Sequence, residues 1–125
     1  MGIIGRIANR KIDHMETNWT KEEFEIYVLL YAAHCNFIET EEEQDYIISK
    51  INTDEAIYNK MHTENVMDNE AVSLQKIQHY LKYNKYSMTD KENLLRHIKK
   101  VFFADGYVDI LEKKVFAQLK KVFGL

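Results

Sequence analysis

The chain has 125 residues, of which 46% are hydrophobic and 30% are charged, enough for one domain with a single core. Its single cysteine excludes an internal disulfide and favours a reducing, cytoplasmic compartment. No apolar run approaches the roughly 18 residues that cross a bilayer, which excludes a transmembrane helix. The net charge of −3 hides an asymmetry, with 6 Lys/Arg and 15 Asp/Glu in residues 1–75, but 11 and 5 in residues 76–125. This split favours docking to a charged partner, or self-association.

Residues 1–19 are expected to form an N-terminal amphipathic segment ahead of a helical domain at 20–125. Basic side chains at Arg6, Arg10 and Lys11 oppose an apolar stripe at helical spacing, made of Ile3, Ile4, Ile7, Ala8, Ile12 and Met15. We expect a first helix that covers the core. The alternative is an arm that lies on a membrane surface or binds a partner.

The central helix is predicted from Lys21 to Cys35. Thr20 and Glu23 have the spacing of a capping box, in which each side chain bonds the backbone of the other. Residues 26–33 are apolar nearly throughout, which indicates a helix buried on all sides. His34 suits the negative end of this helix, where its ring can bond free carbonyl groups.

Two shorter helices are predicted next. Thr40 with Glu43 forms a capping box for the first, and Asn52 with Glu55 marks the start of the second. Residues 62–69 are mostly polar and are predicted to be a connector.

The following helix is predicted over 70–84 and leads into a run in which basic and aromatic residues alternate, with Tyr80, Lys82, Tyr83 and Lys85 as candidate interaction residues. Surfaces that bind single-stranded nucleic acid have this composition. However, a pI near 5.9 does not favour a nucleic-acid partner. The simpler interpretation is that lysines sit at a helix C-terminus and tyrosines at the rim of the core.

The last two helices flank a turn at Gly106, which is the only glycine between Gly5 and Gly124 in a chain without proline. Thr89 with Glu92 is expected to cap the helix before the turn, with an inward face of Leu94, Leu95, Ile98, Val101 and Phe102. Asp109 with Glu112 is expected to cap the helix after it, with an inward face of Leu111, Val115, Phe116, Leu119, Val122 and Phe123.

The turn from Asp105 to Glu112 matches positions five to twelve of an EF-hand loop. Positions one and three would be Val101 and Phe103, which cannot supply oxygen ligands, so a true EF-hand is not predicted. Turn and cap roles for Asp105 and Asp109 are the simpler interpretation.

A second copy of this hairpin lies seventy residues earlier. Asn36 then stands at the position of Gly106, and asparagine is the best substitute for glycine where φ must be positive. Glu39 and Glu42 take the places of Asp109 and Glu112. The helix before the turn aligns as well, with Phe24, Val28, Tyr31 and Ala32 against Leu94, Ile98, Val101 and Phe102. The pattern predicts a degenerate internal repeat.

The paired hairpins resemble the TerB-like superfamily, which includes the tellurite-resistance protein TerB and the N-terminal domain of the co-chaperone DjlA. The resemblance covers about residues 20–125. It implies a compact all-α domain with a role in stress-linked, membrane-associated complexes and no established enzymatic activity. The family's acidic turn residues have been linked to metal binding, although Cys35 stands here where the family usually has aspartate.

We therefore predict an all-α fold of about seven helices, with two pseudo-repeated hairpins around a central buried helix. The favoured function is a non-enzymatic, cytoplasmic protein-interaction or scaffold module without a cofactor. The first alternative is a metal-responsive domain that binds a divalent cation through Asp105, Asp109, Glu112, Glu39 and Glu42. The second is an enzyme whose site the sequence does not reveal, since we find no catalytic motif.

Overall fold

The computed structural model describes residues 18–34, 41–51, 55–103 and 110–125, and in these ranges its regular secondary structure is entirely helical. This confirms the predicted all-α class. The predicted turn residues Asn36 and Gly106, and the amphipathic stripe of residues 1–17, lie outside the described residues. The described helices are α2 (Lys21–Ala33), α3 (Glu41–Ile51), α4 (Glu55–Met67), α5 (Glu70–Tyr83), α6 (Met88–Phe103) and α7 (Ile110–Val122).

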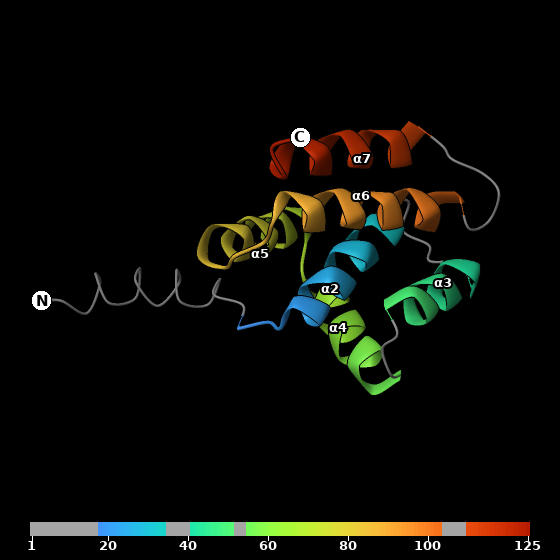
Figure 1. Cartoon of the computed structure of the whole chain (residues 1–125). Coiled ribbons are helices and arrows are strands. Elements are labelled where there is room, and N and C mark those ends of the chain that lie inside the picture. Colours follow the sequence, from blue (N-terminus) through green and yellow to red (C-terminus); the bar gives the residue numbers. More distant parts are fainter. Residues whose placement is uncertain (1–17, 35–40, 52–54, 104–109) are drawn as a thin grey trace, which may run out of the picture.

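Helix α2 lies at the centre of the fold, and the other five helices all contact it (Figure 1). Every residue from Ile26 to Ala33 is at most 8% exposed. A helix without a polar face must be covered on every side. Each apolar side chain left in water would lose the favourable free energy of moving from water into the protein interior. The predicted central helix is therefore confirmed over Lys21–Ala33, while Cys35 lies outside the described residues.

The capping box at the start of α2 is present as predicted. Thr20 Oγ1 accepts a bond of 3.1 Å from the Glu23 backbone N–H, and Glu23 Oε1 accepts one of 3.0 Å from the Thr20 backbone N–H. Glu23 also pairs with Lys60 on α4 at 2.7 Å. The hydrogen bond from Lys60 lowers the pKa of the Glu23 carboxyl. One glutamate thus caps α2 and ties it to α4.

Helix α4 is longer than predicted, and the connector expected at 62–69 is reduced to Asp68 and Asn69. The helix continues to Met67 because Tyr58, Met61 and Asn65 recur at helical spacing and are all buried. Asn69 caps α5 by accepting a 2.8 Å bond from the Val72 backbone N–H.

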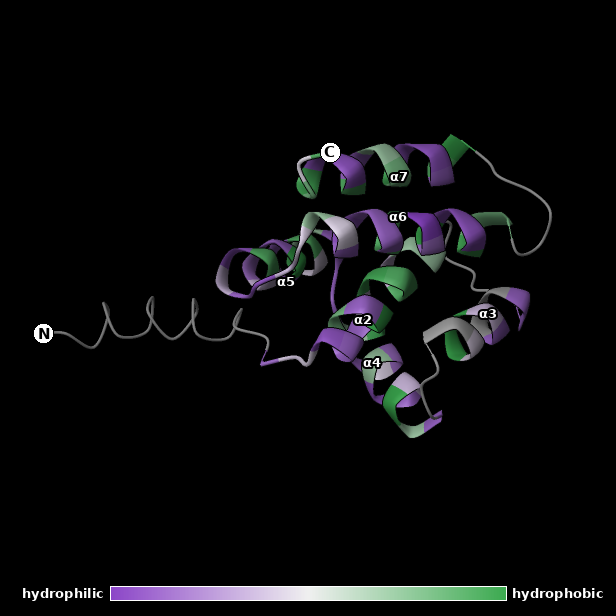
Figure 2. Cartoon of the chain, in the orientation of Figure 1, coloured by the Kyte–Doolittle hydropathy of each residue, from purple (hydrophilic) through white to green (hydrophobic). Residues whose placement is uncertain are grey.

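The cap of α6 is Ser87, two residues before the predicted cap Thr89, and the helix begins at Met88. Ser87 Oγ accepts a 3.0 Å bond from the Asp90 backbone N–H, and Asp90 Oδ2 accepts one of 3.3 Å from Ser87. Thr89 and Glu92 are exposed inside the helix instead. The five residues predicted for its inward face are all buried. Hydrophobic and hydrophilic residues alternate along the ribbon of α6 (Figure 2).

The inward face of α7 differs from the prediction at its first turn. Leu119 and Phe123 are buried, but Leu111 is 45% exposed and Glu112 is only 3% exposed. Val115, Phe116 and Val122 are half-buried at the edge of the core. The helix is therefore rotated so that its second residue, Leu111, lies outside and Glu112 lies inside.

An aromatic cluster closes one end of the core. The Trp19 ring lies 4.4 Å from the Tyr27 ring, and Phe24 stacks on Tyr80 with centroids 4.0 Å apart. Tyr86 meets Phe24 edge-on at 5.1 Å. Trp19 had been assigned to the N-terminal segment, but it is 8% exposed and packs on the helical domain, which therefore begins no later than Trp19.

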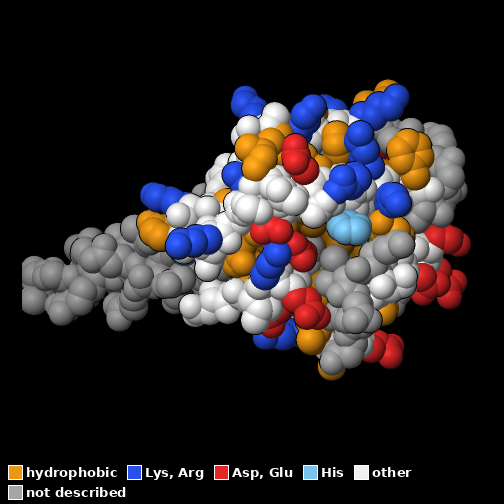
Figure 3. Space-filling model, viewed as in Figure 1, with side chains coloured by type: hydrophobic (Ala, Val, Ile, Leu, Met, Phe, Trp, Pro, Cys, Tyr) orange, Lys and Arg blue, Asp and Glu red, His pale blue; other side chains and the backbone are white. Residues whose placement is uncertain are grey.

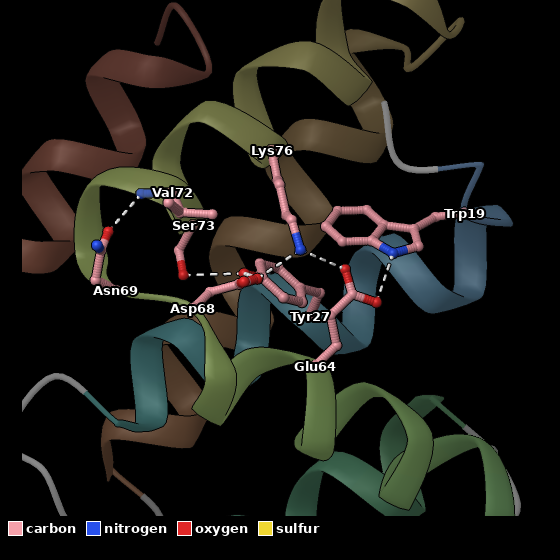
Figure 4. Close-up of polar contacts among 8 residues, drawn as sticks. All are labelled: Trp19, Tyr27, Glu64, Asp68, Asn69, Val72, Ser73 and Lys76. Carbon is pink, nitrogen blue, oxygen red and sulfur yellow. Dashed lines mark hydrogen bonds and ion pairs between the residues drawn. The ribbon is translucent and has the colours of Figure 1, made fainter. Parts of the chain in front are cut away.

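A buried polar network joins α2 to α4 and α5 (Figure 4). The Tyr27 hydroxyl donates to Asp68 Oδ2 at 2.6 Å and lies 2.9 Å from Ser73 Oγ. Lys76 bridges Asp68 at 2.7 Å and Glu64 at 2.9 Å. These contacts provide hydrogen-bond partners for the buried Tyr27 hydroxyl and for the half-buried Lys76 ammonium, both of which have limited access to water.

Burial and the bond to Asp68 raise the pKa of the Tyr27 phenol well above its usual range. Burial alone would lower the pKa of Lys76, but its bonds to Asp68 and Glu64 more than offset this, and the pKa is raised. The network therefore holds a neutral phenol and a charged ammonium near neutral pH.

Replacing Thr20 with alanine should destabilise the protein by about 1 kcal/mol, because the cap of α2 loses its acceptor. Urea unfolding followed by circular dichroism measures this. The control is Thr63→Ala, an exposed site inside α4. Equal destabilisation by both variants would contradict a capping role for Thr20.

Replacing Tyr27 with phenylalanine should cost about 2 kcal/mol at neutral pH, because Asp68 loses a donor in a buried site. The raised pKa adds a pH signature. In the wild type, the unfolded phenol ionises near pH 10 while the folded phenol does not, so stability falls by about 1.4 kcal/mol per pH unit above that point. The phenylalanine variant lacks this loss.

The stability gap between the wild type and Tyr27→Phe should therefore shrink as pH rises through about 10. Unfolding by urea at several pH values tests this. Tyr83→Phe, at a side chain 63% exposed, is the matched control and should cost much less at neutral pH. A gap that stays constant with pH would disprove the role of the Tyr27 hydroxyl.

Candidate interaction surface

The outer sides of α6 and α7 carry a set of exposed cations, which we call the basic face (Figure 3). Helix α6 buries Leu94, Ile98 and Val101, and the helical repeat then directs residues 96, 99 and 100 outward. Helix α7 buries Leu119 and Phe123 and directs its lysine pairs outward in the same way. The basic face consists of Arg96, Lys99, Lys100, Lys113, Lys114, Lys120 and Lys121.

Three large hydrophobic side chains are exposed where α6 ends and α7 begins, and we call them the apolar tip. Phe103 is 61% exposed, Ile110 is 75% exposed and Leu111 is 45% exposed. At this end of the two helices, hydrophobic side chains lie among Lys and Arg side chains (Figure 3). An exposed apolar cluster with a charged rim is typical of a surface that binds another molecule.

Among the described residues, no cation of the basic face forms an ion pair with a carboxylate. The ion pairs in this part of the chain use Lys21, Lys60 and Lys76, none of which belongs to the basic face. Lys99 instead lies 5.3 Å from the centre of the Phe116 ring. Arg96 bonds the neutral side chain of Asn93. The positive potential therefore remains available to a ligand of opposite charge.

The four candidate interaction residues near the end of α5 do not form one surface. Tyr80 is 4% exposed and stacks in the core, so its ring cannot contact a partner. Lys82, Tyr83 and Lys85 are exposed, and the Lys82 ammonium lies 5.2 Å from the Tyr83 ring. Lys82 occupies the last turn of α5, where a cation interacts favourably with the helix dipole.

The five candidate metal ligands are only partly within the described residues. Glu42 is exposed on α3, whereas Glu112 is buried at the start of α7. Glu39, Asp105 and Asp109 lie outside the described ranges. Inside those ranges, no group of three or more His, Cys, Asp or Glu side chains could hold a metal ion. Divalent-cation binding at the turns stays a prediction.

His34 has a different contact from the one expected. Its backbone N–H closes α2 on Leu30, but its ring Nδ1 bonds Asn65 Oδ1 on α4 at 2.8 Å. The His62 ring meets the His34 ring edge-on at 5.2 Å. The sequence signal for this contact was weak, since only the spacing of His62 and Asn65 on one helix suggested a shared face.

The sequence contains a clearer signal for the basic face, and only part of that signal entered the prediction. The lysine pairs at 113–114 and 120–121 are seven residues apart, so they lie on one side of a helix. The charge count showed an excess of cations in this half of the chain without placing them on one surface.

No known protein family, curated protein or solved structure matches this chain. The resemblance to the TerB-like superfamily therefore rests on the sequence pattern alone. In the part of the chain that the structure describes, no helix is long and apolar enough to cross a membrane.

Proposed function

We propose that this chain is a non-enzymatic, TerB-like protein-interaction module that recruits an acidic protein partner through its basic face. The observation that carries the proposal is the set of exposed, unneutralised cations on α6 and α7 beside the apolar tip. Recruitment within a stress-response complex is the role that the family resemblance suggests.

The two parts of this surface suit different tasks in binding. Charge complementarity speeds encounter and selects the partner, while buried aromatic and aliphatic side chains supply most of the affinity. Phe103 and Ile110 can provide that apolar contact. The expected partner is therefore a segment or surface that combines carboxylates with apolar side chains.

The repeat supports the TerB-like arrangement. The helices α2 and α6 end at Ala33 and Phe103, which are seventy positions apart. The four aligned pairs of apolar residues in these helices are buried in both. The following helices also correspond in their packing, because α3 contacts α6 and α7 contacts α2.

Neither Tyr27 nor Lys76 is suited to nucleophilic catalysis, which agrees with the proposed non-enzymatic role. Tyr27 is completely buried, and its raised pKa makes it a poor source of a phenolate nucleophile near neutral pH. Lys76 is held as an ammonium between two carboxylates, so it lacks the lowered pKa that nucleophilic lysines need.

The test compares two charge reversals of equal size. Lys113→Glu with Lys114→Glu alters the basic face, and Lys82→Glu with Lys85→Glu alters exposed lysines elsewhere. Immobilised wild-type protein should capture a reproducible partner from native extract at low salt. The first variant should lower the recovery about tenfold, which corresponds to about 1.4 kcal/mol, and the second should not.

Recovery is measured by quantitative mass spectrometry, and circular dichroism verifies that both variants are folded. Two results would refute the proposal. One is the absence of any reproducible partner for the wild type. The other is equal recovery by the wild type and the Lys113→Glu, Lys114→Glu variant.

A further inference from the structure

Helices α3 and α7 carry equal and opposite charge at corresponding places in the two hairpins. Helix α3 has Glu41, Glu42, Glu43 and Asp45 against Lys50, so its net charge is −4 + 1 = −3. Helix α7 has four lysines against Glu112, so its net charge is +4 − 1 = +3. The offset of seventy residues places 41–51 against 111–121, although the apolar residues of these two helices match only after a further shift of about two residues.

The four lysines of α7 are exposed, whereas Glu112 is buried. Glu41, Glu42 and Asp45 are exposed and lie at i, i+1 and i+4, so they form one side of α3, which we call the acidic face. Acidic side chains gather around α3, and basic ones gather over α6 and α7 (Figure 3). Among the described side chains, no ion pair joins the two faces within one chain.

We infer that a second copy of this chain docks its acidic face on the α7 part of the basic face. This inference rests on the proposed function, because both assign a carboxylate-bearing ligand to the same lysines. The three acids span about 6 Å along α3 and the two lysine pairs span about 12 Å along α7, since each helical residue rises 1.5 Å. One acidic face can therefore lie along one α7 helix without bending either.

The two surfaces that meet are different parts of the chain. Two copies can therefore pair reciprocally about a two-fold axis, or each contact can leave one acidic and one basic face free, so that the assembly closes into a ring or grows as an open chain. Exposed ion pairs contribute little individually and are screened within about 10 Å at 0.1 M salt. Association should therefore be weak and should disappear as salt is added.

The experiment measures mass by sedimentation and light scattering over a concentration series up to about 0.5 mM, in about 20 mM and about 300 mM NaCl. At low salt, the average mass of the wild type should rise above the 14.9 kDa of one chain with increasing concentration. At high salt, it should return to that of the monomer.

Two charge reversals give the specific test. Glu41→Lys with Glu42→Lys changes the net charge of α3 from −3 to +1, and Lys113→Glu with Lys114→Glu changes that of α7 from +3 to −1. Each variant alone should stay monomeric. An equimolar mixture should associate again, because the unaltered α7 of the first variant still matches the unaltered α3 of the second, and the reversed α3 of the first matches the reversed α7 of the second. A chain with all four substitutions should also associate.

A wild type that stays monomeric at low salt would overturn the inference, as would a mixture that fails to associate. Association that persists in both single variants would also overturn it, because another surface would then be responsible. The Glu41→Lys, Glu42→Lys variant separates this from the proposed function. It should lose self-association while still capturing an acidic partner from extract, whereas failure of the proposed function alone would remove that capture in the wild type.

Discussion

The burial of α2 on every side is the constraint on which the rest of the structure depends. Residues 26–33 offer no polar side to solvent, so five helices must cover them. Each covering helix turns its apolar residues inward and is left with its charged residues outside. The basic face is one consequence, since α6 buries Leu94 and Ile98 against the core and thereby directs Lys99 and Lys100 to solvent.

Apolar burial alone would allow the covering helices to slide along α2, and the polar groups of α2 limit that freedom. Tyr27 bonds Asp68 at the end of α4, and Tyr31 donates to Gln118 on α7 at 2.9 Å. Glu25 accepts a 2.7 Å bond from Tyr86, in the connector between α5 and α6. A slipped helix would leave a buried polar group without its partner, which costs more than a small change in apolar contact.

Much of this fold could be predicted from the sequence wherever the pattern is long and its periodicity unbroken. The central helix, its capping box and the buried face of α6 were predicted because each rests on several residues that agree. The start of α6 was misplaced because Ser87 with Asp90 and Thr89 with Glu92 have the same capping spacing, and local chemistry does not rank them. For Tyr80 the sequence left a core-rim role and an interaction role open, because tyrosine suits both, and its burial and its stacking on Phe24 favour the core rim.

The first turn of α7 shows where tertiary packing overrides local preference. Burying Leu111 and exposing Glu112 would suit the stability of an isolated domain, since a buried leucine contributes about 2 kcal/mol and a buried carboxylate needs compensation. The observed arrangement is the reverse. Departures of this kind are expected at functional surfaces, where stability is given up for contact with another molecule. Leu111 joins Phe103 and Ile110 in the apolar tip, so the failed prediction falls on the surface that the proposed function assigns to a partner.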